Sequence, residues 1–272
     1  MGATARGADI HFTTRGAGPA CLVLSSIGTA PYELQMPAAL DARAQLVFVD
    51  VRGSGRSSGD VADLTFDVLA EDLEIVRRAL GHEQVAVLGH SMLGAFALEY
   101  ARRCPATVSH AIVVGTPPDG DMRALQAQGA AFFEQEASPA RKQRLRDNLS
   151  HLDPATPPAL AMLAQTPMRF YDPSFDAASI FVGAQVKPQV LMHILGTMLP
   201  GWSVSSAAPA LRTPMLIAHG QHDYVVPWAL WADIVKDLPT ATLRVFEKSG
   251  HQPFFEEPAE FAAVFGDWLA TH

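Results

Sequence analysis

The sequence predicts an α/β fold in which a mostly parallel, twisted sheet is flanked by helices and carries an inserted helical cap. Continuous apolar runs are typical of strands buried on both faces of a parallel sheet. Helix-like segments separate most of these runs, and the alternation of strand and helix is the pattern of a doubly wound sheet. The predicted strands cover residues 21–25, 46–50, 85–89, 111–115, 215–219 and 242–246.

The clearest helix lies between the second and third predicted strands. Its apolar residues recur at steps of three and four, which places them on one face of a helix. Gly81 follows as a C-terminal stop, because glycine readily adopts the left-handed conformation that ends helices. The residues on the apolar face are Phe66, Leu69, Leu73, Val76 and Leu80.

The alternation breaks between Pro117 and Leu211, where helix-like segments cover residues 123–136, 141–152 and 189–199. We predict that residues 119–207 form a helical cap, while residues 1–118 and 208–272 form the core. Apolar and flexible methionine side chains of a cap suit an apolar substrate pocket. The candidates for substrate binding are Phe133, Met162, Phe170, Phe181, Met192 and Trp202.

Composition limits the partners of the chain. The 272 residues carry a formal charge of −8, and 18% of them are charged, so a nucleic-acid partner is not expected. No stretch reaches the roughly 18 apolar residues of a membrane span, and no secretory signal is recognisable, so we expect a cytoplasmic protein away from membranes. The expected partner is a small-molecule substrate, and homodimer formation stays open. Cys21 and Cys104 are expected to fill space without forming a disulfide.

Ser91 lies in the stretch "GHSMLG", between the predicted strand 85–89 and a helix-like segment. A serine at a sharp strand-to-helix turn is the context of a nucleophile elbow. The N-terminus of the following helix presents backbone N–H groups and a partial positive charge, which stabilise a developing oxyanion. Ser91 is therefore a candidate nucleophile, although a serine that only caps the helix would give the same local pattern.

Asp223 and His251 supply the partners that such a serine needs. Each follows a predicted strand and a glycine turn, so both are expected at the carboxyl edge of the sheet with Ser91. An imidazole removes the serine proton, and a carboxylate holds the imidazole tautomer. Asp119, after the preceding strand, is the alternative acid.

With Ser91, Asp223 and His251 in this order, the chain resembles the α/β-hydrolase superfamily over nearly its whole length. The loop "DVRGSGRSSG" at residues 50–59 and the histidine segment "GHQPFFEEPAEF" are similar to motifs of that family. In the loop, we expect Asp50 and Arg52 to form a structural ion pair. The resemblance implies the α/β-hydrolase fold and fixes no substrate.

Two positions depart from the family pattern. Ser25 and Ser26 stand where the family usually has His-Gly, and they are expected to hydrogen-bond their loop. The resemblance implies an oxyanion hole formed by the backbone N–H groups of Ile27 and Met92, which side-chain changes leave in place. Leu93 replaces a glycine, so space for it is expected from Gly94 and Ala95. Enol-lactone hydrolases of the family have a stretch similar to "SSIGT", which favours a lactone.

The resemblance implies a serine hydrolase that cleaves a small or medium carboxylic ester or lactone with an apolar acyl part, through an acyl-enzyme and with no metal or organic cofactor. A proline iminopeptidase-like aminopeptidase is an alternative, suggested by the loop at 50–59 and by Glu134 and Glu136. Carbon–carbon bond hydrolases and cofactor-free perhydrolases share the same triad and stay open. A ligand receptor on a hydrolase fold is the non-enzymatic alternative.

Overall fold

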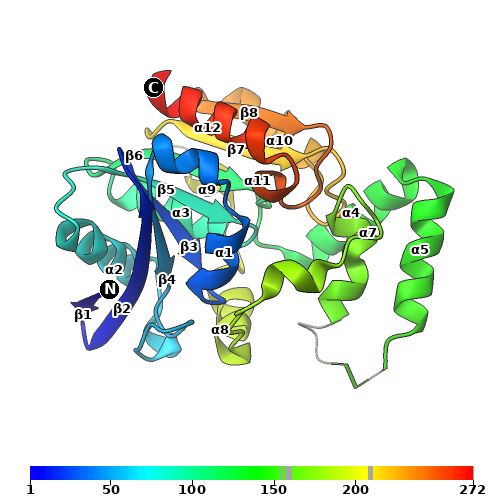
Figure 1. Cartoon of the computed structure of the whole chain (residues 1–272), viewed down its shortest axis with the longest axis horizontal. Coiled ribbons are helices and arrows are strands. Elements are labelled where there is room, and N and C mark those ends of the chain that lie inside the picture. Colours follow the sequence, from blue (N-terminus) through cyan, green and yellow to red (C-terminus); the bar gives the residue numbers. More distant parts are fainter. Residues whose placement is uncertain (154, 157–160, 208–210, 272) are drawn as a thin grey trace.

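The computed structural model describes residues 1–153, 155–156, 161–207 and 211–271, and its centre is an eight-stranded sheet (Figure 1). The strand order is β1-β2-β4-β3-β5-β6-β7-β8. All six predicted strands are present and run parallel to one another, which confirms the α/β fold class. They are β3 (Ala20–Ser25), β4 (Gln45–Asp50), β5 (Val85–His90), β6 (Val108–Val114), β7 (Met215–Gly220) and β8 (Ala241–Phe246).

The first two strands, β1 (Gly2–Ala5) and β2 (Ala8–Gly16), were not predicted from the sequence. They form an antiparallel pair, and β2 continues antiparallel onto β4. The first half of β2 alternates between buried and more exposed residues, and its second half is partly buried. Because this strand lies near the sheet edge, it lacks the continuous apolar run that marked the inner strands.

Helices cover both faces of the sheet, as the side-chain alternation of the strands requires. Along β3, Cys21 and Val23 face the cluster that contains α1 (Thr29–Gln35), α11 (Pro253–Glu256) and α12 (Pro258–Thr271). Leu22 and Leu24 face the opposite cluster, which contains α2 (Phe66–Ala79) and α3 (Leu93–Arg103). The inner strands are therefore apolar at most positions because both of their faces are core.

Helix α2 is present as predicted, but the predicted ion pair between Asp50 and Arg52 is wrong. Arg52 does not pair with Asp50; its guanidinium donates to Asp72 of α2, with Nη2 2.6 Å from Oδ1. Asp50 instead accepts the backbone N–H of Arg56 at 2.9 Å, inside its own loop. The α2 helix brings Asp72 to the loop after β4, and no local sequence pattern shows this long-range partner.

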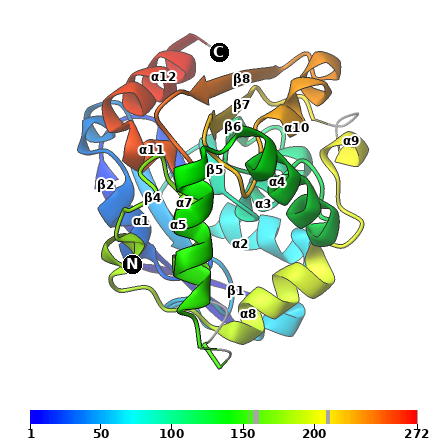
Figure 2. The same ribbon diagram turned by 90° about the vertical axis from the view of Figure 1, so that its right-hand side faces the viewer.

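The chain leaves the sheet after β6 and returns at β7, and the intervening segment is mainly helical. The predicted segments 123–136 and 141–152 are helices α4 and α5, and 189–199 is α8 followed by a π turn (Ile194–Met198). Figures 1 and 2 show α4, α5 and α7 beside the sheet. The helices are α4 (Met122–Glu136), α5 (Pro139–Ser150), α7 (Thr166–Arg169), α8 (Pro188–His193) and α9 (Val204–Ala207).

Proline and serine explain one of the cap boundaries. Ser138 caps α5 by accepting the N–H of Arg141, and Pro139 occupies the first turn, where its missing N–H costs nothing.

The predicted division between cap and core at residues 207 and 208 stays a prediction, and residue 208 lies outside the described ranges. Within those ranges, no helix has both the length and the apolar character needed to span a bilayer.

Candidate active site

Ser91 lies directly after β5, at a tight turn into α3. Its backbone has φ of 57°, the left-handed region that non-glycine residues rarely adopt. The Ser91 N–H donates to Val114 O at 2.8 Å, and the Gly94 N–H donates to Ser91 O at 3.0 Å. This strained turn is the geometry of a nucleophile elbow, which projects the side chain above the strand end.

Gly89 and Gly94 allow helix α3 to lie close to its neighbouring segments. A Cβ at Gly89 would overlap the Leu93 backbone oxygen, and a Cβ at Gly94 would overlap the Thr116 side chain. Leu93, which replaces a glycine of the family pattern, is 2% exposed and packs in the core. The close approach to Thr116 is thus made by Gly94, and the Leu93 side chain is accommodated in the core.

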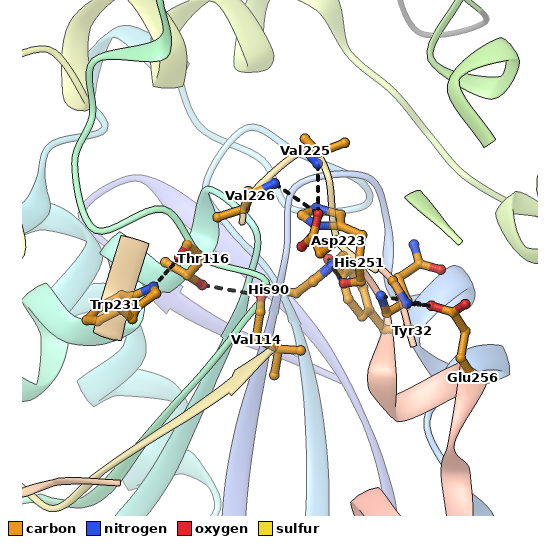
Figure 3. Close-up of polar contacts among 12 residues, drawn as sticks. Tyr32, His90, Val114, Thr116, Asp223, Val225, Val226, Trp231, His251 and Glu256 are labelled. Atoms are coloured by element: carbon orange, nitrogen blue, oxygen red, sulfur yellow. Dashed lines mark hydrogen bonds and ion pairs between the residues drawn. The ribbon is translucent and has the colours of Figure 1, made fainter. Parts of the chain in front are cut away.

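Asp223 and His251 meet at the carboxyl edge of the sheet. Asp223 follows β7, and its Oδ2 lies 2.7 Å from His251 Nδ1. Its other oxygen, Oδ1, accepts the N–H groups of Val225 at 3.0 Å and Val226 at 2.9 Å (Figure 3). The alternative acid, Asp119, is exposed and accepts the N–H of Asp121 in its own turn. The structure thus pairs His251 with Asp223 and leaves Asp119 at the surface.

The backbone of His251 is fixed from two sides. Its N–H donates to Arg169 O at 2.6 Å, and its carbonyl oxygen lies 3.0 Å from His90 Nε2. Since a carbonyl only accepts, His90 Nε2 carries the proton. Burial, with a smaller effect of His251, lowers the pKa of His90 well below its ordinary value, so His90 Nδ1 is free to accept the Tyr32 hydroxyl at 3.0 Å. His90 therefore positions the histidine loop.

Ser91 and His251 both line a cavity of about 210 Å³. His251 Nε2, the ring nitrogen not bonded to Asp223, is buried without a hydrogen-bond partner among the described residues. The cavity also has a largely apolar wall. Its apolar residues are Ile27, Met92, Leu93, Met162, Phe181, Val186 and Leu191.

Only two of the six predicted substrate-binding residues, Met162 and Phe181, line this cavity. Phe133 packs on Tyr224, with ring centroids 5.1 Å apart, and Phe170 packs on Phe175 at 4.8 Å. Trp202 is buried and donates from Nε1 to Glu99, and Met192 is 68% exposed. The prediction is wrong for these four because an apolar cap residue can equally pack against the cap, pack on the core or face solvent.

The predicted oxyanion donors lie on opposite sides of Ser91 in sequence and both line the cavity. Met92 precedes α3, whose first backbone N–H groups have no partners within the helix. The Ile27 N–H lies 3.2 Å from Ser25 Oγ, and the Ser25 hydroxyl donates to Gly28 O at 2.7 Å. Ser25 therefore hydrogen-bonds its loop as expected, and the Ile27 N–H would have to leave a long hydrogen bond to hold an oxyanion.

Five polar residues of the cavity were missed: Tyr32, Gln35, Arg169, Lys187 and Gln252. Arg169 could have been noticed, because it is a lone cation between Met168 and Phe170. Gln252 is adjacent to the predicted His251. The other three lie far from Ser91 in sequence, so the sequence alone does not show that they are close to it in space.

His219 and His222 lie close to Asp223 in sequence, and histidine and carboxylate side chains are common metal ligands. His219 is fully buried, with its ring centroid 6.4 Å from that of Trp231. Burial lowers the pKa of His219 to about 4. In the described part of the chain, no group of three or more histidine, cysteine, aspartate or glutamate residues could hold a metal ion.

Comparisons with known proteins agree with this fold. The family model described as "alpha/beta hydrolase fold" matches residues 18–258. The chain is 30% identical, over 97% of its length and 96% of the relative, to "AB hydrolase superfamily protein YclE" of Bacillus subtilis (strain 168). The chain therefore belongs to the α/β-hydrolase family.

Two further relatives illustrate the range of this family. The chain is 27% identical to "Pimeloyl-[acyl-carrier protein] methyl ester esterase" of Vibrio vulnificus (strain YJ016), over 93% of this chain and 95% of the relative. A solved alpha/beta fold family hydrolase from Bacillus anthracis str. Sterne has a TM-score of 0.74 at 20% identity, covering 98% of each chain. Together, these similarities support a hydrolase and leave its substrate open.

Proposed function

We propose that the protein is a serine hydrolase that cleaves a small or medium carboxylic ester or lactone, with Ser91, Asp223 and His251 as its triad. One observation carries the proposal. The strained turn at Ser91 and the hydrogen-bonded Asp223–His251 pair come from three distant parts of the chain and meet at one cavity edge. A serine that only capped a helix would need neither partner.

In the proposed reaction, His251 Nε2 takes the Ser91 hydroxyl proton as Oγ attacks the substrate carbonyl carbon. The negative charge moves to the carbonyl oxygen, where the Met92 and Ile27 N–H groups hold it. The imidazolium then gives its proton to the leaving alkoxide, and an acyl-Ser91 ester forms. Water, deprotonated by His251, attacks this ester and releases the acid and free Ser91.

Several observations favour an ester or lactone. The apolar wall formed by residues such as Met162, Phe181 and Leu191 suits an apolar acyl part. Esterases are among the named relatives, and a pimeloyl methyl ester esterase is 27% identical. A lactone needs the same attack, and its alcohol stays tethered to the acyl group.

The cavity does not favour the aminopeptidase alternative. A free amino terminus calls for an acidic partner, and none of the described residues that line the cavity is acidic. Glu134 and Glu136, which suggested this alternative, are exposed on α4. Their carboxylates are therefore a solvated helix face.

The test is hydrolysis of p-nitrophenyl esters of increasing acyl length, beside lactones and proline p-nitroanilide. We expect ester or lactone turnover by the wild type, near-complete loss in Ser91→Ala, and unchanged turnover in the control Ser150→Ala at the surface end of α5. A fluorophosphonate reagent should add to the Ser91 peptide, as mass spectrometry can check. Turnover retained in Ser91→Ala contradicts the proposal.

The same panel separates the remaining alternatives. A ligand receptor would bind esters with few or no catalytic cycles, so accumulated product over many cycles excludes it. Hydrolysis of vinylogous 1,5-diketones or peroxide-dependent peracid formation, in the absence of ester turnover, would instead favour a carbon–carbon bond hydrolase or a perhydrolase.

A further inference from the structure

Unpartnered polar atoms gather around the cavity that contains Ser91. Four buried side-chain atoms of its lining have no hydrogen-bond partner in the described structure, and buried polar atoms are normally paired. Two of them, Gln35 Oε1 and Gln252 Oε1, are amide oxygens. The third is His251 Nε2, which the proposed mechanism uses. The fourth is Arg169 Nε, for which that mechanism has no role.

Arg169 ends helix α7 of the cap and contacts the histidine loop through its backbone. Its carbonyl oxygen accepts the His251 N–H at 2.6 Å, and a Cβ on Gly250 would overlap that same peptide group. The backbone of Arg169 is therefore fixed against the catalytic loop. Its side chain is left to line the cavity.

Two other cations of the cap make structural hydrogen bonds to backbone carbonyls. The Arg141 guanidinium donates to three backbone carbonyls, among them Pro167 O and Phe170 O at 2.8 Å each. Lys187, which also lines the cavity, donates to Gly53 O at 3.0 Å. The Arg169 side chain has neither a hydrogen bond nor an ion pair with any described residue.

The charge of Arg169 is uncompensated at the cavity. Burial lowers its pKa, while Asp223 acts in the opposite direction. Asp223 already accepts two N–H groups and pairs with His251, so its oxygens are occupied. A guanidinium stays protonated in proteins; Arg169 is partly buried, and its Nε is fully buried without a partner, which is costly for a donor of a charged group. An anionic ligand group would remove that cost.

We propose that Arg169 binds a second carboxylate of the substrate, so that the preferred substrate is an ester or lactone that carries an ionised carboxylate beside the bond to be cleaved. The proposal rests on the proposed hydrolase function and narrows its substrate class. Arginine suits this task because its planar donors match the two oxygens of a carboxylate. The apolar wall would hold the methylene chain between the two ends.

Two matched pairs of esters test this. Monomethyl glutarate carries the carboxylate on the acyl side, and methyl 5-methylhexanoate replaces its two oxygens with methyl groups. On the alcohol side, 3-acetoxypropanoate is matched by isopentyl acetate. We expect the wild type to show a higher kcat/KM for the anionic member of at least one pair, by about 10- to 100-fold, the range typical of a hydrogen bond to a charged group.

Three variants locate the preference. Arg169→Gln should reduce the anionic-to-neutral ratio to near one, and Arg169→Lys should keep part of it. Arg146→Gln removes the same charge from an exposed site on α5 and should keep the wild-type ratio. The ratio within each variant is the readout, because a merely structural role of Arg169 would lower both members of a pair equally.

The outcomes distinguish this proposal from the hydrolase proposal. Ester turnover without preference for either anionic member, or a preference that survives Arg169→Gln, overturns the role of Arg169 and leaves the hydrolase standing. If no ester is turned over, calorimetry with monomethyl glutarate and the Ser91→Ala protein decides. Binding weakened about tenfold or more by Arg169→Gln in that background supports the carboxylate site, and unchanged binding or none overturns it.

Discussion

Asp223 holds His251 with one carboxylate oxygen, 2.7 Å from Nδ1, while its other oxygen accepts two backbone N–H groups. The carboxylate direction is fixed because its two oxygens have different partners, and both N–H donors belong to the turn that follows Asp223 itself. The imidazole is in turn fixed with Nε2 as its unpartnered nitrogen. A short local turn thus orients the group that receives the serine proton in the proposed mechanism.

Asp223→Asn should keep this turn and lose most of the activity. The amide oxygen can still accept the Val225 and Val226 N–H groups, but its NH₂ would face His251 Nδ1 and favour the wrong imidazole tautomer. We expect kcat to fall by about 10³- to 10⁴-fold with little change in melting temperature. Asp233→Asn, at an exposed site, is the control; equal activity in the two variants would contradict the role of Asp223.

Gly94→Ala should destabilise the protein, because its Cβ would overlap the Thr116 side chain. Overpacking of this kind costs about 1 to 3 kcal/mol of unfolding free energy, which outweighs the helix preference of alanine. Gly196→Ala is a matched control, since a Cβ there meets nothing within 4 Å. Urea unfolding of both variants measures the difference, and equal stabilities would show that α3 can shift away from Thr116.

Glu256 connects the cap to the histidine loop. Its Oε1 accepts the Tyr171 N–H at 2.6 Å, and its Oε2 accepts the Gly250 N–H at 2.8 Å. Burial raises the pKa of Glu256 to about 7, and these N–H groups reduce the rise. The folded protein therefore keeps the carboxyl proton at pH values where the unfolded chain has already lost it.

The raised pKa of Glu256 makes the stability of the folded protein depend on pH. This contribution to stability is complete below the ordinary pKa of about 4.5 and is lost as the pH rises to about 7. The loss is at most about 3 kcal/mol. Glu256→Gln should flatten this part of the profile, as urea unfolding between pH 4.5 and 8 can measure, whereas Glu83→Gln at an exposed site should keep it. An unchanged slope in Glu256→Gln would contradict the raised pKa.

The sequence predicts the inner sheet well and its N-terminal edge poorly. The runs at β3 to β7 are largely apolar because these strands are covered on both faces, so their pattern is strong. The pair β1 and β2 lies at the edge of the sheet, and the partly polar β2 was missed. Arg52 was assigned to Asp50, two residues away, because its partner Asp72 lies on a different element.

By itself, the sequence determined the α/β class and the order of Ser91, Asp223 and His251, since strand patterns and turn residues are local. Only the tertiary structure decided which cap residues face that site: Met162 and Phe181 line the cavity, whereas Phe133 and Trp202 pack elsewhere. It also brought the unpaired side chain of Arg169 to the same cavity. The physical reason is that an apolar or charged side chain has several environments that suit it equally, and long-range packing selects among them.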